Sequence, residues 1–232
     1  MGDEAKRGFH QDLEDLQTQI VRLAALVTEA IPRATRALLD MDLALAQAVI
    51  DNDDELDAQS LLIEERCLRM LTLQQPMAGD LRRIFTAIKM NAELERAGDL
   101  SVNICKTIRR IYGTSLDPKI RGLLEQMSDE AHMLTRTALD AFVTNDVELA
   151  GALDDMDDSL DVLHTEYVHA ILEAHESRGL DLQTAVQLAL IGRYYERIGD
   201  HAVVVGERTQ YMITGTLPET AGVARARDAD SS

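Results

Sequence analysis

The chain has 232 residues, and 23 lysines and arginines against 41 aspartates and glutamates give it a formal net charge of −18. Nucleic acid and direct membrane insertion are therefore not expected, because binding to nucleic acid or to an anionic bilayer requires a basic surface. A hydrophobic content of 46% and a charged content of 28% are those of a folded globular protein. Aromatic residues make up only 3% and there are four prolines, so the composition favours helices over an all-β fold.

No segment is apolar for long enough to cross a bilayer. The longest run without a charged residue, Leu182 to Gly192, has eleven residues, whereas a transmembrane helix needs about 20. The N-terminus lacks the apolar segment of a secretory signal peptide, and we expect a cytoplasmic protein. Cys67 and Cys105 are too far apart to suggest a disulfide framework or a thiolate zinc site, so both are expected to be buried and reduced.

In the first half of the chain, apolar residues recur at helical spacing. They predict a helix from near residue 5 with a kink or break at Pro32, because proline cannot donate the backbone hydrogen bond to residue 28. A second helix follows the turn at residues 51–54 and ends at Gln74-Gln75-Pro76. A third helix runs to about Tyr112, and Gly113 to Pro118 is the predicted linker.

Three further helical patterns follow the linker. The first leads toward Phe142, the second is broken at Ser177-Arg178-Gly179, and the third ends near Gly215. The sequence therefore predicts an all-α fold of two tandem, pseudo-symmetric three-helix bundles with six long helices. The predicted bundles span residues 1–113 and 118–215, and residues 216–232 are expected to form a disordered tail.

The two halves repeat one another. The segment Glu95-Arg96-Ala97-Gly98-Asp99 recurs 101 residues later as Glu196-Arg197-Ile198-Gly199-Asp200. Likewise, Asp53-Asp54-Glu55-Leu56-Asp57 recurs 104 residues later as Asp157-Asp158-Ser159-Leu160-Asp161. The difference of three falls in the turn between the second and third helices, where insertions are tolerated. This pattern predicts a duplicated unit.

Each repeat carries two pairs of carboxylates spaced four residues apart, so each pair shares one helical face with Cβ atoms about 6 Å apart. The candidate metal ligands are Glu95, Asp99, Glu196, Asp200, Asp53, Asp57, Asp157 and Asp161. If the second and third helices pack side by side, each bundle gathers four carboxylates. Oxygen ligands suit Mg, Mn, Ca or oxo-bridged iron. The alternatives are a solvated acidic face on a metal-free interaction module and, less favoured, a carboxylate-bridged metalloenzyme.

Three residues within the repeated motifs carry further expectations. A glycine inside a helix costs about 1 kcal/mol relative to alanine, so Gly98 and Gly199 predict either a close approach of two backbones or open space at a site. His201 is more readily interpreted as a structural hydrogen-bonding residue than as a metal ligand.

The sequence contains no phosphate loop, dinucleotide fingerprint or nucleophile elbow, and no enzymatic activity is expected.

These motifs resemble those of the PhoU family of phosphate-specific transport regulatory proteins. The resemblance rests on Leu71 to Arg82, Asp54 to Asp57, Glu93 to Asp99 and Glu196 to His201, and it extends from about Phe9 to Gly215. The second copy departs from the first in lacking the Gln-Gln-Pro turn and in carrying valine where the first carries asparagine, at positions 204 and 103.

The resemblance implies a homodimer that regulates rather than catalyses. Family members help to keep a phosphate-starvation sensor histidine kinase inactive when phosphate is plentiful, acting between that kinase and the ATPase of the phosphate ABC transporter. Some bind multinuclear metal clusters through Glu/Asp-x-x-x-Asp motifs, which implies Fe, Mn, Mg or Zn at the candidate ligands. Because a net charge of −18 repels phosphate, we expect the phosphate signal to arrive through the partners.

Overall fold

The computed structural model describes residues 2–216, so the predicted tail lies outside the described residues except for Thr216. It contains eight helices: α1 (Gly2–Leu39), α2 (Leu43–Asp51), α3 (Asp53–Gln74), α4 (Ala78–Ile108), α5 (Pro118–Thr144), α6 (Val147–Gly151), α7 (Leu153–Arg178) and α8 (Leu182–Thr214). Six are long and two are short, and no strand occurs in residues 2–216. The predicted all-α class with six long helices is confirmed.

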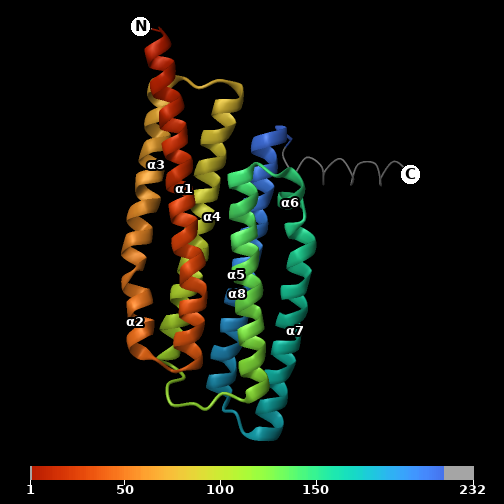
Figure 1. Cartoon of the computed structure of the whole chain (residues 1–232). Helices are drawn as coiled ribbons and strands as arrows, with labels where there is room; N and C mark the ends of the chain where they lie inside the picture. Colours follow the sequence, from red (N-terminus) through yellow and green to blue (C-terminus); the bar gives the residue numbers. More distant parts are fainter. Residues whose placement is uncertain (1, 217–232) are drawn as a thin grey trace, which may run out of the picture.

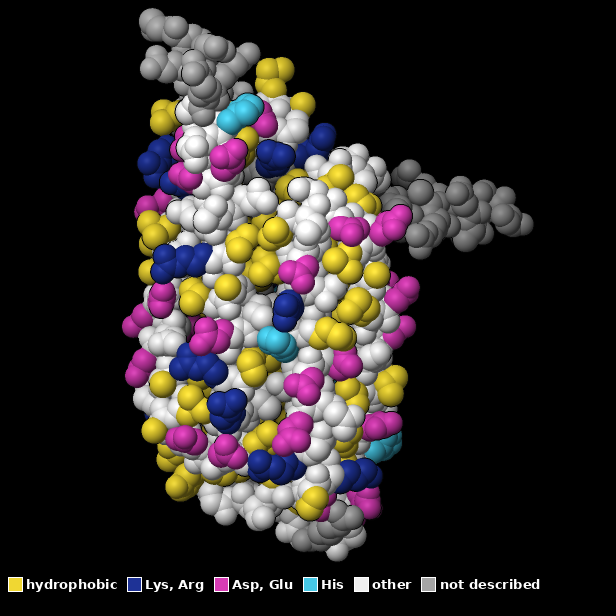
Figure 2. All heavy atoms as spheres, in the orientation of Figure 1, with side chains coloured by type: hydrophobic (Ala, Val, Ile, Leu, Met, Phe, Trp, Pro, Cys, Tyr) yellow, Lys and Arg dark blue, Asp and Glu magenta, His cyan; other side chains and the backbone are white. Residues whose placement is uncertain are grey.

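The long helices lie side by side in one elongated bundle (Figure 1), and the space-filling view in the same orientation shows the elongated shape (Figure 2). Helices α1 to α4 form the first repeat and α5 to α8 the second, joined by residues 109–117. In Figure 1, α1 and α5 lie in front of α4 and α8, while α3 and α7 lie on the outer sides. The most extensive contact between two helices is that of α4 with α8. The two repeats therefore share a core along their last helices.

Aspartates fix where several helices begin. Asp42 and Asp146, pseudo-equivalent in the two repeats, cap α2 and α6 by accepting hydrogen bonds from backbone N–H groups. Asp181 caps α8 in the same way. At the other end of α7, Gly179 adopts a φ of 74°, a left-handed conformation that glycine takes without steric cost. The short α2 and α6 and their caps were not predicted.

Pro32 does not break the first helix, so of the predicted kink or break, the break is wrong. Helix α1 is assigned without interruption from Gly2 to Leu39. Ile31 and Ala34, on either side of the proline, are fully buried. A proline inside a helix costs about 3 kcal/mol, and the burial of these apolar side chains on both sides of it offsets that cost. The third predicted helix also ends earlier, at Ile108 instead of Tyr112.

A buried hydroxyl network joins the two repeats. The Thr35 hydroxyl donates to the carbonyl oxygen of Ile31 at 2.9 Å. It therefore accepts from the hydroxyl groups of Ser128 and Tyr195, each at 2.7 Å. Because these residues lie on α1, α5 and α8, the network fixes the relative position of three helices from both repeats.

Both cysteines are buried and free, as predicted, and burial raises the pKa of each thiol to about 12. None of the helices in residues 2–216 is both long and apolar enough to cross a membrane.

Candidate functional site

The structure brings the first group of predicted carboxylates together. Asp53 and Asp57 lie in the first turns of α3, and Glu95 and Asp99 lie on the adjacent α4. Burial raises the pKa of Asp53, and the charges of Asp57 and Asp99 raise it further. The pKa of Glu95 is raised by burial and then by Asp57, Asp99 and Glu64. Each carboxylate is thus close enough to others of its group to oppose their ionisation.

The second repeat forms a corresponding group that lacks one member. Burial and then the charges of Asp161 and Asp200 raise the pKa of Asp157 to about 6. Glu196, the counterpart of Glu95, instead pairs with Arg193 one turn earlier on α8. The structure therefore brings Asp157, Asp161 and Asp200 together, while Glu196 is engaged by a basic neighbour that the sequence analysis did not consider.

Side chains of the neighbouring helix fill the space beside the two motif glycines, rather than its backbone or open space as predicted. A Cβ atom on Gly98 would collide with the side chain of Leu56 on α3. A Cβ atom on Gly199 would lie 2.7 Å from the Cδ2 atom of Leu160 on α7 and would also collide with Asp157. Glycine at these positions makes room for Leu56 of α3 and for Leu160 and Asp157 of α7 where these helices pack against α4 and α8.

The chemistry of these groups fits an oxygen-seeking cation, but the side chains are not pre-arranged around one. In residues 2–216, no group of three or more His, Cys, Asp or Glu side chains is placed to hold a metal ion. Three side-chain oxygens of the predicted ligands are nevertheless buried without a hydrogen-bond partner: Asp53 Oδ1, Asp157 Oδ1 and Glu196 Oε2. Buried oxygens normally have a partner, and a cation would supply one after the side chains move closer together.

The raised pKa of Asp157 predicts a pH-dependent stability. Its folded-state value of about 6 lies above the ordinary 3.8, so the folded protein binds more protons than the unfolded chain between these values. Stability should therefore fall as pH rises from about 4 to about 6.

Urea denaturation of Asp157→Asn, in the presence of a chelator, tests this expectation. At about pH 7.5 the variant should be more stable than the wild type by about 1 kcal/mol after solvent screening. At about pH 4 the two proteins should be equally stable. Asp155→Asn controls for the loss of one exposed charge, and equal profiles for all three proteins would contradict the prediction.

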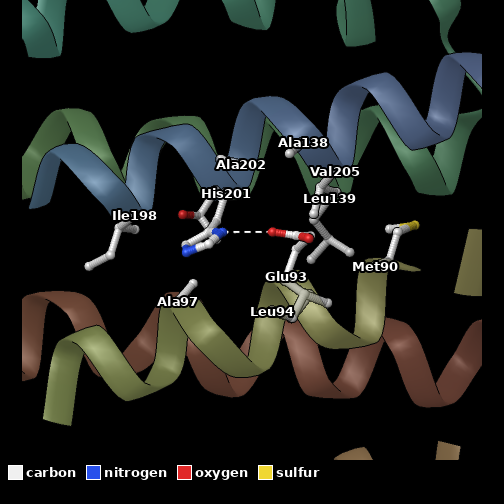
Figure 3. A pocket seen from close by; sticks show the side chains of 12 residues that line it. Met90, Glu93, Leu94, Ala97, Ala138, Leu139, Ile198, His201, Ala202 and Val205 are labelled. Carbon is white, nitrogen blue, oxygen red and sulfur yellow. Dashed lines mark hydrogen bonds and ion pairs between the residues drawn. The ribbon is translucent and has the colours of Figure 1, made fainter. Parts of the chain in front are cut away.

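His201 forms a partly buried hydrogen bond to a carboxylate, and the sequence analysis did not identify this partner. Its side chain, on α8, is 9% exposed, and its Nδ1 atom lies 2.7 Å from the Oε2 atom of Glu93 on α4. Figure 3 shows the pair spanning the space between the two helices. The hydrogen bond from His201 holds the pKa of Glu93 below its ordinary value. The interpretation of His201 as a structural hydrogen-bonding residue is confirmed, but nothing in the spacing identified Glu93 as its partner.

The Glu93–His201 pair lines a small cavity, and the two repeats differ at this cavity. The cavity has a volume of about 10 Å³, enough for about one water molecule. Its lining includes Ala24, Leu94 and Leu139, which are pseudo-equivalent to Ser128, Tyr195 and Thr35 of the hydroxyl network. On this side of the pseudo-symmetric core, alanine and leucine therefore stand where the hydroxyl network lies on the other side. The hydrogen bond between His201 and Glu93 is the polar contact between α8 and α4 on this side.

The residues do not favour a di-iron enzyme. Such a centre takes a Glu-x-x-His from each of two facing helices, and the sequence contains a single such spacing, Glu166 to His169. Both of these side chains are exposed on α7.

The fold and the two acidic groups define a class of helical proteins built from a duplicated three-helix unit with carboxylates at matching positions. The PhoU domain family model matches residues 20–108 and 124–209, which is one match in each repeat. The chain belongs to the PhoU family.

Curated relatives and solved structures agree with this assignment. The phosphate-specific transport system accessory protein PhoU homolog 1 of Mycobacterium tuberculosis H37Rv is 36% identical over 211 residues, covering 90% of this chain and 95% of that protein. The Rhizobium meliloti homolog is 31% identical over 91% of this chain and 89% of its own length. The crystal structure of PhoU from Pseudomonas aeruginosa superimposes with a TM-score of 0.84 at 28% identity, covering 90% of this chain and all of that chain. That of the Streptococcus pneumoniae phosphate transport system regulatory protein PhoU gives 0.83 at 25% identity, covering 90% and 98%.

Proposed function

We propose that this protein is an accessory protein of a phosphate transport system and a negative regulator of phosphate uptake and of the phosphate-starvation response. It acts as a non-catalytic adaptor, in the cytoplasm and as a homodimer, between the ATPase of the phosphate ABC transporter and the sensor histidine kinase. The observation that carries this proposal is the match of the PhoU domain to both repeats, together with relatives whose names describe phosphate transport accessory proteins.

A reporter of phosphate-starvation genes tests the regulatory role. In cells that lack the gene, the reporter should be expressed strongly in phosphate-rich medium, because the kinase is no longer held inactive. The wild-type gene supplied in trans should restore repression. A reporter that stays repressed in phosphate-rich medium without the gene would contradict the regulatory role.

We further propose that cations bind at the two acidic groups. Glu95, Asp99, Asp53 and Asp57 would hold a cation in the first repeat, and Glu196, Asp200, Asp157 and Asp161 in the second. The buried unpartnered oxygens and the raised pKa of Asp53 and Asp157 support this proposal. A bound cation, such as Fe, Mn, Mg or Zn, would neutralise the carboxylates and link α3 to α4 and α7 to α8.

Elemental analysis distinguishes a metal site from a metal-free interaction module. The protein should be purified without an affinity tag or chelator. The double variant Glu95→Ala/Glu196→Ala should lose most of the metal, because it removes one carboxylate from each group. The matched control Glu125→Ala/Glu148→Ala removes two exposed glutamates elsewhere and should retain the metal. Equal metal content in the variant and the wild type would eliminate the proposed sites, and a metal-free wild type would favour the module without a cation.

A further inference from the structure

A histidine on α7, His164, lies at one end of the acidic group of the second repeat. It follows Asp161 by three residues, which is about one helical turn, so the two side chains share one face of α7. His164 is partly buried, unlike His169, which is exposed on the same helix. The imidazole of His164 is therefore directed toward the contact of α7 with a neighbouring helix.

Contacts with α8 show which carboxylate lies beside His164. A Cβ atom on Gly199 would collide with Asp157, and one on Gly192 would lie 3.2 Å from the Cδ2 atom of His164. Asp157 thus lies opposite Gly199, and His164 lies opposite Gly192. Glu196 is four residues, about one turn, from Gly192 in the direction of Gly199. It therefore lies between the two contacts, one turn from the position that faces His164.

The first repeat has a different pair of side chains at these positions. Ser60 and Asn91 are pseudo-equivalent to His164 and Gly192. The side-chain amide of Asn91 donates to the Oγ atom of Ser60 at 2.9 Å, and this hydroxyl donates to the Oε2 atom of Glu95 at 3.5 Å. The position of Ser60 is thus next to a carboxylate of the first group.

In the second repeat a larger side chain and a smaller one have been exchanged across the helix contact. Glycine stands where the first repeat has asparagine, and an imidazole stands where it has a hydroxyl. A Cβ atom on Gly192 would also lie 2.7 Å from two ring carbons of Tyr167, so the space beside this glycine is filled. The donor beside the glutamate thereby changes from an oxygen atom to a nitrogen atom.

The charges around His164 leave it neutral. Burial and then the charge of Arg193 lower the pKa of His164, whereas the charge of Asp161 acts in the opposite direction. The neutral imidazole is the form that binds a metal ion. A lowered pKa therefore keeps this side chain ready to act as a ligand at neutral pH.

Arg193 opposes a cation at this end of the group. It pairs with Glu196, so it competes with a cation for this carboxylate and adds a positive charge of its own. Its side chain is 52% exposed, and it can turn toward solvent when a cation binds. The imidazole of His164 is a donor for which an arginine does not compete, because a guanidinium pairs with carboxylates.

We propose that His164 is a ligand of the cation in the second acidic group, beside the carboxylates of that group. This inference rests on the proposed binding of cations. Binding draws the imidazole and the carboxylates together, as it does the carboxylates of the first group. Carboxylates alone suit Mg²⁺ and Mn²⁺, whereas imidazole suits Zn²⁺ and Fe²⁺. The two repeats therefore differ in preference, and the second binds Zn²⁺ in preference to Mg²⁺.

A zinc titration in excess Mg²⁺ tests the ligand. The probe is Zn²⁺, added to full-length protein that was purified without a tag and stripped of metal. His164→Gln keeps an uncharged polar side chain and should weaken Zn²⁺ binding about tenfold or more, because it removes the nitrogen donor. The matched control His169→Gln replaces the exposed histidine of the same helix and should bind Zn²⁺ like the wild type.

X-ray absorption of the zinc-loaded protein provides a second readout. The wild type should show the scattering of an imidazole ring bound to zinc, and His164→Gln should not. The wild-type spectrum does not depend on the folding of any variant, and urea denaturation of metal-free His164→Gln shows whether that variant is folded.

The outcomes separate this inference from the proposed cation binding. If no imidazole is bound to zinc, if His164→Gln binds Zn²⁺ like the wild type, or if His169→Gln is weakened as much, His164 is not the ligand. The proposed binding of cations by the carboxylates then stands. If the wild type binds neither Zn²⁺ nor, when each is added alone, Mg²⁺ or Mn²⁺, both proposals fall.

Discussion

Replacing Gly206 with valine should lower the free energy of unfolding by about 3 kcal/mol, because it overpacks the contact between α6 and α8. A Cβ atom at this position would lie 2.8 Å from the backbone carbonyl oxygen of Ala150 and 2.5 Å from the Cδ1 atom of Leu153. The leucine could change rotamer, but the carbonyl belongs to the short α6 and cannot move without displacing that helix. Urea denaturation at neutral pH measures the loss.

Gly122→Val provides the control. Gly122 lies in α5, and nothing lies within 4 Å of the position that its Cβ atom would take. Valine there should change stability by less than about 1 kcal/mol, as expected from helix propensity alone. Similar losses for the two variants would mean that the close approach of α6 to α8 does not determine the effect.

Removing one member of the Glu93–His201 pair should also be costly. Glu93→Ala leaves the buried His201 without its partner, and we expect a loss of about 2 kcal/mol in the free energy of unfolding at neutral pH. The double variant Glu93→Leu/His201→Leu removes both polar groups from an otherwise apolar cavity and should regain most of that loss. A double variant less stable than either single variant would contradict this account.

The pH dependence of the pair has a defined sign. Because the hydrogen bond from His201 lowers the pKa of Glu93, the folded protein favours the ionised carboxylate. The stability gained from this hydrogen bond is present above the ordinary pKa of glutamate and is lost as pH falls through the lower folded-state value. The difference between wild type and Glu93→Ala should therefore shrink in acid.

The sequence predicted the long helices well because each must bury one apolar stripe, and such stripes repeat at a spacing that can be read directly. Ile20, Leu23 and Val27, which recur at helical spacing in the first predicted helix, are all fully buried. The break at Pro32 was wrongly predicted because the local cost of a proline is visible in the sequence, whereas the burial of its neighbours depends on helices distant in the chain. The short α2 and α6 lack the length at which periodicity becomes informative.

The acidic groups were partly predictable for a different reason. Spacing places Glu95 and Asp99 on one face, and duplication shows that the pattern recurs, but neither reveals a neighbouring basic residue such as Arg193. The Glu93–His201 pair joins residues 108 apart in the chain, and it has no counterpart in the other half. Internal repetition therefore could not reveal it. Partners that differ between the copies require the three-dimensional structure.

The shared core of α4 and α8 bears on how such a protein could arise. If the two halves were separate chains, the α4–α8 seam would bring them together as the two subunits of a symmetric pair, and residues 109–117 would only tether them. A single ancestral gene could thus have encoded a self-associating three-helix protein before duplication and fusion. In one chain the two sides of the seam need not be identical, and they differ here: the hydroxyl network lies on one side and the His201–Glu93 pair on the other.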